Sequence, residues 1–463
     1  MKIDFENLGN IEKGSIELND FTLFCGKNNS GKTYAMYSIY GLLSIDFREN
    51  YKQSLNIEHV KFDFVQTIID KLEQGKYSLN LDDFLLLYKK EMLDVLARRL
   101  EFFLPNLFGV TKDNFSQTRI QLDFSDENIK ERIKQSEIKS YRYKRFSLDI
   151  DEKEIQFSLA NEEKLDGNTS PSLQLKISGW LIGILFFDWY FSQNPFLLPA
   201  ERAGINLLLK ELFSVRNLAI QQAQNDNANA MRLLNEIIKA RYAEPLKDYM
   251  QYINSISGYQ KEDSSYRQYA EAIQHNVLGG EYEVDEFNNI FFIPSDSKNK
   301  LPLHFSSSTV KTLFGLVFYL KHQAKKGDCL MIDEPELNLH PDNQRKVARV
   351  LAQLVNAGLK VIVSTHSDYF VRELNNLIML KKNFTGSVEL QKEYGYQDNE
   401  LLDEKRISAY LFDNNEITKM GLDEEGIIVD TFDEVINKLN QSSNKIYFAM
   451  QDAKDLNEQK QRG

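Results

Sequence analysis

A phosphate-binding loop constrains this chain more than any other feature of its sequence. Residues 26–33 read Gly-Lys-Asn-Asn-Ser-Gly-Lys-Thr and match the pattern G-x-x-x-x-G-K-[ST] in full. The glycines let the backbone curl around phosphate oxygens, the lysine neutralises the β- and γ-phosphates, and the threonine hydroxyl is a ligand for Mg²⁺. The residues that we expect to bind a nucleoside triphosphate are Gly26, Lys27, Asn28, Asn29, Ser30, Gly31, Lys32 and Thr33.

The segments on either side of this loop suit the same interpretation. An apolar strand, Phe21–Cys25, runs into the loop, and a helix-like segment, Thr33–Leu43, follows it. A helix N-terminus adds its dipole and its free N–H groups to an anion site. The order strand, loop and helix therefore predicts an α/β fold built around the loop.

The bulk composition predicts a globular cytoplasmic protein with more than one lobe. The chain has 463 residues and a net charge of −12, which argues against a surface coated in basic residues for wrapping DNA. The two cysteines, Cys25 and Cys329, make no disulfide framework, so a reducing compartment is expected. The most apolar run, Trp180–Phe191, is short and contains Asp188, so it predicts a buried helix rather than a membrane span. No signal-peptide core begins the sequence.

A second motif lies far downstream of the loop. Cys329–Asp333 is an apolar strand that ends in Asp333 and is followed by Glu334. A buried strand would deliver Asp333 to the phosphate site as a Mg²⁺ ligand, and Glu334 would be placed to polarise an attacking water. The run Pro335–Pro341 that follows makes an ordinary strand end with two solvated acids a weak alternative.

A third motif follows a predicted helix over 343–357. The apolar strand Lys360–Ser364 ends just before His366. A histidine at the end of such a strand can hydrogen-bond a γ-phosphate and respond to its loss. A single histidine in a turn is usually structural, but the order and spacing of the motifs favour the functional interpretation.

Together these motifs resemble an ABC-type ATPase head of the SMC/RecF/OLD class. Residues 26–33 resemble Walker A, Cys329–Glu334 resemble Walker B with its catalytic glutamate, Asn338–Pro341 occupy the place of the D-loop, and His366 matches the switch histidine. The resemblance implies an α/β P-loop head with a mixed sheet and an inserted helical lobe. It also implies ATP and Mg²⁺ as ligands, with Thr33 and Asp333 holding the metal and Glu334, His366 and Lys32 serving catalysis.

This family also needs a signature loop that reaches the ATP of a partner subunit. The candidate is Phe305–Thr309, in which serines replace the usual glycines, ahead of a predicted helix over 310–322. The resemblance implies that the Ser306 hydroxyl and the Ser308 N–H contact a γ-phosphate across a dimer. The same residues also satisfy the pattern of a plain serine N-cap. No Q-loop glutamine is identified.

We expect six regions along the chain. They are an N-terminal part of the head with Walker A (1–50), a mixed helical and strand insertion (51–190), a core strand returning to the head (191–203), a helical arm-like lobe (204–270), a C-terminal part of the head (271–383) and a C-terminal extension (384–463). The insertion is predicted to contain helices such as Asp82–Phe103 and strands over 118–160, and a hairpin is predicted over 279–293. A terminal helix is predicted over Thr431–Leu439.

Two further segments allow a functional and a structural interpretation. Lys139–Phe146 alternates basic and aromatic residues, which suits either nucleic-acid contact or a half-buried strand with a solvated basic face. Arg202 follows an apolar strand that contains Pro199, and the resemblance implies that it borders the nucleotide site. Arg202 would then contact a phosphate or a subunit interface, and the alternative is a surface ion pair.

The predicted function is an ATP-dependent switch. Two heads would close around ATP as a homodimer or higher homo-oligomer and open on hydrolysis. The segment after Leu380 lacks the D-x-D of a TOPRIM nuclease. The chain is therefore similar to nuclease-less ATPases of two-gene anti-phage systems such as Septu and PARIS, which implies a separate protein effector, a nuclease or a toxin. The alternative is a RecF-like ATPase clamp that binds DNA during repair. No membrane partner is expected.

Overall fold

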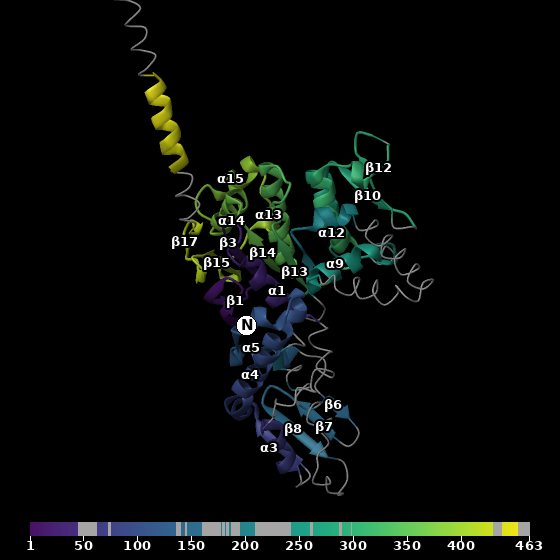
Figure 1. The fold of residues 1–463 in the computed structure, drawn as a ribbon, viewed down its shortest axis with the longest axis vertical. Helices are drawn as coiled ribbons and strands as arrows, with labels where there is room; N and C mark the ends of the chain where they lie inside the picture. The colour runs from purple at the N-terminus through teal and green to yellow at the C-terminus, as the bar shows by residue number, and fades with distance from the viewer. Residues whose placement is uncertain are drawn as a thin grey trace, which may run out of the picture.

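The computed structural model describes most of the chain (Figure 1). The described residues are 1–44, 63–72, 76–135, 140–143, 146–159, 177, 181, 185–186, 195–208, 242–259, 263–286, 289–297, 299–428 and 438–451. Most of the apolar run at 180–191, most of the predicted arm at 204–270, and Lys144 and Arg145 of the basic run lie outside this set. No helix in the described part of the chain is both long and apolar enough to cross a membrane.

A nine-stranded mixed sheet forms the centre of the molecule. Its order is β5 (Arg119–Asp123), β1 (Lys2–Leu8), β2 (Ile11–Glu17), β16 (Glu416–Lys419), β15 (Ile407–Asp413), β3 (Phe21–Gly26), β14 (Lys360–Thr365), β13 (Cys329–Asp333) and β9 (Phe196–Leu198). The strands from β15 to β9 are parallel to one another, and β5, β1 and β2 pair antiparallel. The predicted α/β P-loop fold with a mixed sheet is confirmed.

Helices cover both faces of the parallel strands, which is why these strands are continuous apolar runs. Along β13, Leu330 and Ile332 belong to one hydrophobic cluster, while Cys329 and Met331 belong to the other. The first cluster includes α12 (Ser308–His322), α13 (Pro341–Asn356) and α14 (Asp368–Lys381). The second includes α1 (Lys32–Leu43) and α4 (Leu81–Phe108).

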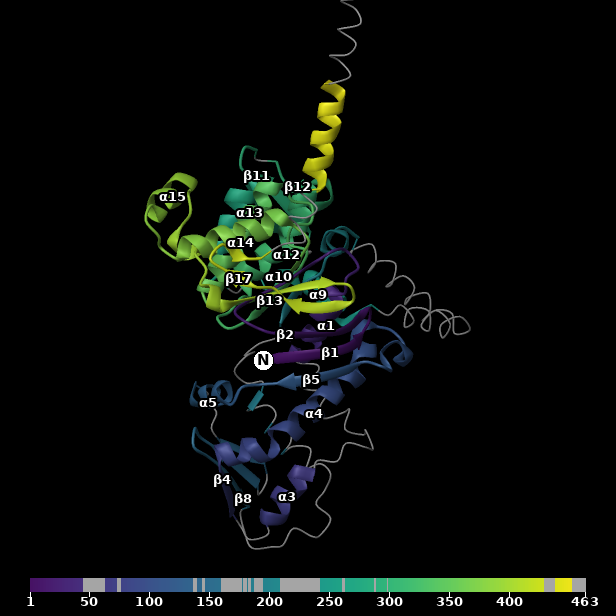
Figure 2. The ribbon, with the colours of Figure 1, turned by 90° about the vertical axis from the view of Figure 1, so that its left-hand side faces the viewer.

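The insertion forms a lobe of its own but also adds a strand to the head (Figure 2). Its antiparallel sheet has the order β4 (Lys76–Asn80), β8 (Glu154–Leu159), β7 (Phe146–Ile150) and β6 (Ser140–Tyr143), accompanied by α3 (Asp63–Leu72) and α5 (Asp126–Gln135). The 28-residue helix α4 runs from this lobe to the main sheet, and its C-terminal half packs on α1 and β5. A short 3-10 turn, Lys112–Phe115, connects α4 to β5. β5 lies within the predicted insertion 51–190 and pairs with β1 of the head.

The basic and aromatic run lies partly on β6, at the edge of the small sheet. Tyr141 is half-buried against the core, and Arg142 is exposed. For these residues the geometry matches a half-buried strand with a solvated basic face.

A second helical region precedes the serine segment. It contains the turn 202–208, α9 (Glu244–Asn254), α10 (Ile256–Tyr259), α11 (Arg267–Ile273) and a π-helical turn, Gln274–Leu278. The predicted hairpin is confirmed as β10 (Gly280–Val284) and β11 (Ile290–Pro294), with β12 (Leu301–Pro302) beside it. A 3-10 turn, Leu303–Phe305, then leads to α12.

The region 384–463, predicted as a C-terminal extension, adds strands to the main sheet in its described part. It contains α15 (Ser387–Tyr394), 3-10 turns at Asp398–Glu400 and Glu404–Arg406, β15, β16, and the hairpin β17 (Leu422–Asp423) and β18 (Gly426–Ile427). β15 pairs in parallel with β3 along its length, from Ile407 opposite Phe21 to Phe412 opposite Gly26. Of the terminal helix predicted over Thr431–Leu439, residues 431–437 lie outside the described set, and a helix is present over 438–451.

Candidate active site

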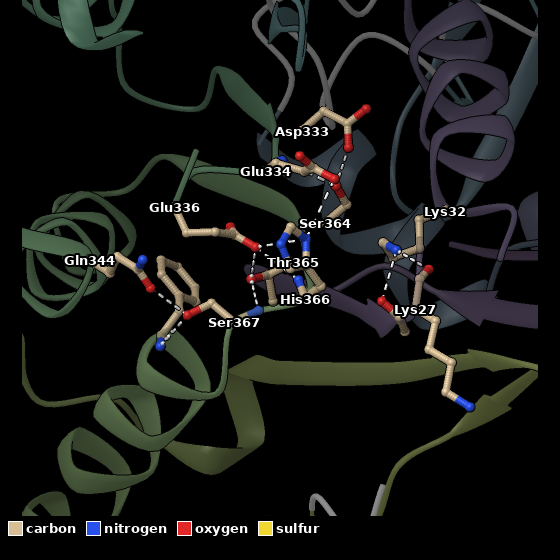
Figure 3. Close-up of polar contacts among 12 residues, drawn as sticks. Lys27, Lys32, Asp333, Glu334, Glu336, Gln344, Ser364, Thr365, His366 and Ser367 are labelled. Carbon is tan, nitrogen blue, oxygen red and sulfur yellow. Dashed lines mark hydrogen bonds and ion pairs between the residues drawn. The ribbon is translucent and has the colours of Figure 1, made fainter. Parts of the chain in front are cut away.

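The three sequence motifs meet at one edge of the sheet (Figure 3). β13, β14 and β3 are parallel neighbours, with Asp333 opposite Ser364 and Thr365 opposite Cys25. The carboxyl ends of all three strands therefore lie side by side. Each motif begins where its strand ends, so side chains that are about 300 positions apart in the sequence come into contact, as Thr33 and Asp333 do.

The backbone of the phosphate-binding loop requires glycine at two positions. Gly26 has φ 151° and Gly31 has φ 101°. A Cβ at Gly26 would lie 2.4 Å from the carbonyl oxygen of Phe412, and one at Gly31 would lie 2.6 Å from Cγ1 of Ile11. No side chain caps α1, so the N–H groups of its first turn are left for an anion.

Lys32 and Ser30 direct polar atoms into this loop. Lys32 Nζ donates to the carbonyls of Gly26 at 2.9 Å and Lys27 at 2.7 Å. Burial lowers the pKa of Lys32, and the nearby carboxylate of Asp333 opposes that shift. Ser30 Oγ is buried and has no hydrogen-bond partner in the part of the chain that is described. The Lys27 side chain points away from Lys32 (Figure 3).

Thr33 and Asp333 form a donor set that fits Mg²⁺. Thr33 Oγ1 donates to Asp333 Oδ2 at 2.9 Å, and Ser364 donates to Asp333 Oδ1. Oxygens at neighbouring corners of an octahedron with metal–oxygen distances of about 2.1 Å lie about 3.0 Å apart. Among the described residues no group of three or more His, Cys, Asp or Glu side chains forms a metal cage. Magnesium normally takes a hydroxyl, one or two carboxylates, substrate phosphates and water, so this small set suits it.

Glu334 has an unusual backbone conformation for its residue type. Its φ is 53°, in the left-handed region that non-glycine residues rarely adopt. Its N–H donates to the Ser364 carbonyl at 3.0 Å. Burial raises the pKa of the Glu334 carboxyl, and His366 opposes this shift. The Glu334 side chain is 23% exposed, so it is partly accessible to solvent.

Glu336, for which the sequence motifs predict no role, holds the segment Thr365–His366. Its Oε1 accepts from Thr365 Oγ1 and from the His366 N–H, both at 2.8 Å, and lies 3.3 Å from His366 Nδ1. His366 Nδ1 also lies 3.5 Å from Glu334 Oε1, so the histidine lies between the two glutamates. The sequence feature that points to Glu336 is its place in the acidic run at the end of β13, where it is separated from Glu334 by one proline.

The serine segment is divided between a buried and an exposed part. Ser306 is 8% exposed, and its hydroxyl lies 3.4 Å from the Pro302 carbonyl. Ser307 is the N-cap of α12 and accepts from the Val310 N–H at 3.3 Å. Ser308 begins the helix and is exposed, as is Phe305, which is 76% exposed. The N-cap function therefore belongs to Ser307, and Ser308 remains accessible.

Arg202 lies in the interior and is not part of a surface ion pair. It is 2% exposed, and its guanidinium donates to backbone carbonyls at the end of β13. Among the described residues it therefore holds protein backbone in the place where a phosphate or partner contact was expected. The sequence does not distinguish these roles of Arg202, because every residue has a backbone carbonyl and its position is set only by the fold.

Comparison with known protein families identifies an ATPase domain over most of the chain. The family model described as AAA ATPase domain matches residues 1–371. No curated protein sequence matches the chain.

Several solved structures are similar to this chain, with low TM-scores and low sequence identities. They include the SmcHead bound to the C-winged helix domain of ScpA, with 12% identity, 90% of this chain and 96% of that chain covered, and a TM-score of 0.33. A second is the Smc head domain with an extended coiled coil bound to the C-terminal domain of ScpA derived from Pyrococcus furiosus, with 12% identity, coverages of 95% and 98%, and a TM-score of 0.32. A third is the SMC head domain from Thermotoga maritima, with 10% identity, coverages of 91% and 98%, and a TM-score of 0.31. These values are too low to support any statement about the activity or partners of this chain.

Proposed function

We propose that this chain, which belongs to the AAA ATPase domain family, binds ATP with Mg²⁺ and hydrolyses it where β3, β13 and β14 end. The observation that supports this most directly is the 2.9 Å hydrogen bond from Thr33 to Asp333. It joins the phosphate-binding loop to the acidic strand end in the arrangement that a Mg²⁺–nucleotide complex requires.

Each residue of the site has a separate task in this proposal. Lys32 binds the β- and γ-phosphates, and Thr33 and Asp333 hold Mg²⁺, which neutralises charge on the phosphate oxygens. Glu334 accepts a proton from the attacking water as the bond between the γ-phosphorus and the ADP oxygen breaks, giving ADP and phosphate. His366, placed between Glu334 and Glu336, donates a hydrogen bond to the γ-phosphate.

We further propose that two copies of the chain close around two ATP molecules. In this ABC-type arrangement Ser306 and Ser308 of one copy approach the γ-phosphate bound by the other. The exposed N-terminus of α12 at Ser308 and the exposed ring of Phe305 support an intermolecular role for this segment. The buried hydroxyl of Ser306 makes the Ser308 N–H the better candidate for the contact.

The biological role that we propose is control of a separate protein effector by ATP-dependent closure. The resemblance of the run Asp333–Pro341 to OLD-like ATPases of prokaryotic anti-phage systems supports a cytoplasmic defence function with a nuclease or toxin partner. The alternative is a RecF-like clamp on DNA. Two assays on the closed form would distinguish these roles. One is copurification with the proteins encoded by neighbouring genes, and the other is a DNA-binding assay.

The hydrolysis proposal is tested by steady-state ATPase assays on substituted proteins. We expect Glu334→Gln to lower kcat by about 100-fold or more while nucleotide binding is retained, because the base is lost but the phosphate contacts remain. We expect Lys32→Ala to weaken nucleotide binding itself. Glu389→Gln, at an exposed position of α15, is the matched control and should behave like wild type. Equal kcat for Glu334→Gln and Glu389→Gln would contradict the assignment of Glu334.

A further inference from the structure

The guanidinium of Arg202 is bound by three backbone carbonyls. Its Nη1 donates to Pro199 O at 2.9 Å and to Asp333 O at 2.7 Å, and its Nη2 donates to Glu334 O at 2.6 Å. Arg202 is 2% exposed, so these bonds form out of water, where each is stronger and a lost one costs more. One side chain therefore holds two consecutive carbonyls at the end of β13.

These carbonyls belong to the residues that matter most for hydrolysis. Glu334 has φ 53°, a conformation that persists in a non-glycine residue only where its surroundings enforce it. Ser364 binds the N–H of Glu334 on one side, and Arg202 binds its carbonyl on the other. The direction of the Glu334 carboxylate follows from this backbone, so Arg202 contributes to setting it.

The same helical turn also contacts the helix that follows the serine segment. Asn206, one turn after Arg202, donates from Nδ2 to the carbonyl of Lys311 on α12 at 2.7 Å. Tyr249 of α9 donates to Asn206 Oδ1 at 3.0 Å and keeps the amide in this orientation. The turn 202–206 thus connects the end of β13 with the N-terminal part of α12.

We propose that Arg202 is a positioning residue for ATP hydrolysis, which orients Glu334 through its carbonyl and links it through Asn206 to α12. This inference rests on the proposed function of Glu334. Arginine suits the task because its planar fork presents several N–H donors to neighbouring acceptors at once, whereas lysine presents a single point charge on a flexible stem. If α12 moves when the serine segment contacts a second copy, this movement would be transmitted through Asn206 and Arg202 to Glu334 of the same chain.

The test compares Arg202→Lys with Arg349→Lys in the full chain. Arg349 on α13 also binds a buried carboxylate, that of Glu373, but it lies outside the proposed site. We expect Arg202→Lys to lower kcat by about 10- to 100-fold with KM for ATP changed by less than about 3-fold, since a displaced base costs rate and not binding. Arg349→Lys should keep both constants.

Thermal melts identify any variant that fails to fold. If Arg202→Lys does not fold, Asn206→Ala replaces it, with an expected loss of about 3- to 10-fold in kcat and an unchanged KM. Wild-type hydrolysis together with equal kcat for folded Arg202→Lys and Arg349→Lys would overturn the inference. A raised KM with unchanged kcat would also overturn it, because it would assign Arg202 to nucleotide binding. Absence of hydrolysis in the wild type would instead overturn the proposed function, and this role with it.

Discussion

At the scale of single residues, the proposed site depends on carboxylates with different surroundings. Asp333 is fixed by Thr33 and Ser364, which suits a metal ligand. Glu334 is partly exposed and has a raised pKa because of burial, which suits a group that exchanges a proton. Glu336 is buried and accepts from the Thr365–His366 segment, so its task is structural. In the proposed site, three acids within four positions therefore have three different surroundings, and we propose a different task for each.

The task of Glu336 can be separated from that of Glu334 by two substitutions. Glu336→Ala removes the acceptor for Thr365 Oγ1 and the His366 N–H, and we expect the free energy of unfolding to fall by about 1–3 kcal/mol. Glu336→Gln keeps an acceptor oxygen in the same place and should stay much closer to wild type. Urea denaturation of both variants measures the difference. Equal destabilisation by Ala and Gln would show that the acceptor oxygen is not what matters.

At the scale of elements, α4 ties the inserted lobe to the edge of the head. Its Glu101 accepts from the Ile120 N–H of β5 at 2.7 Å, and β5 in turn pairs with β1. Burial raises the pKa of Glu101, although this hydrogen bond and nearby arginines oppose the shift. The contact between helix and strand therefore includes a carboxyl group that is protonated more readily in the folded protein than in the unfolded chain.

This raised pKa predicts a pH dependence of stability. A carboxyl whose folded pKa lies above its unfolded value, about 4.3, favours the folded state at low pH, and that contribution is lost as pH rises through the folded pKa. We expect Glu101→Gln and wild type to be equally stable near pH 4 and the variant to be the more stable at pH 7. Denaturation midpoints across this range measure the difference. A Glu101→Gln protein that is less stable than wild type at pH 7 would contradict the assigned direction.

At the scale of the whole molecule, the strand that leads into the phosphate-binding loop depends on the far end of the sequence. β15 pairs with β3 in register, and Phe412 contacts Phe24 with ring centroids 5.2 Å apart. The Phe412 carbonyl also lies where a side chain on Gly26 would fall. The loop is therefore shaped in part by residues nearly 400 positions away.

Two truncations test this dependence. A chain ending at residue 403 loses β15 and β16, so β3 loses one of its two neighbours, and we expect no cooperative unfolding transition. A chain ending at residue 428 keeps these strands and lacks residues 429–463, of which the described residues, 438–451, form a helix that is almost entirely exposed. It should unfold as the full chain does. Calorimetry compares the two, and identical transitions for both truncations would contradict a structural role for β15.

How much of the structure could be predicted from the sequence depends on how far apart in the chain the interacting residues lie. The phosphate-binding loop, the acidic strand end and His366 are local patterns, and the structure brings them together as parallel strands require. The pairing of β15 with β3 and of β5 with β1 joins distant segments, and alternating or apolar strands do not specify which strand lies beside them. The roles of Arg202 and Glu336 depend on backbone groups and could be seen only in the folded chain.

The measurement that tests the central claim most directly is the mass of the purified protein in solution with ATP and Mg²⁺. It compares wild type, Glu334→Gln and Lys32→Ala by light scattering after size exclusion. We predict that Glu334→Gln accumulates a dimer or larger assembly that forms only with ATP, because nucleotide binds and is not hydrolysed, and that Lys32→Ala does not form it. Assembly that is the same in all three proteins, with or without ATP, would contradict an ATP-gated switch.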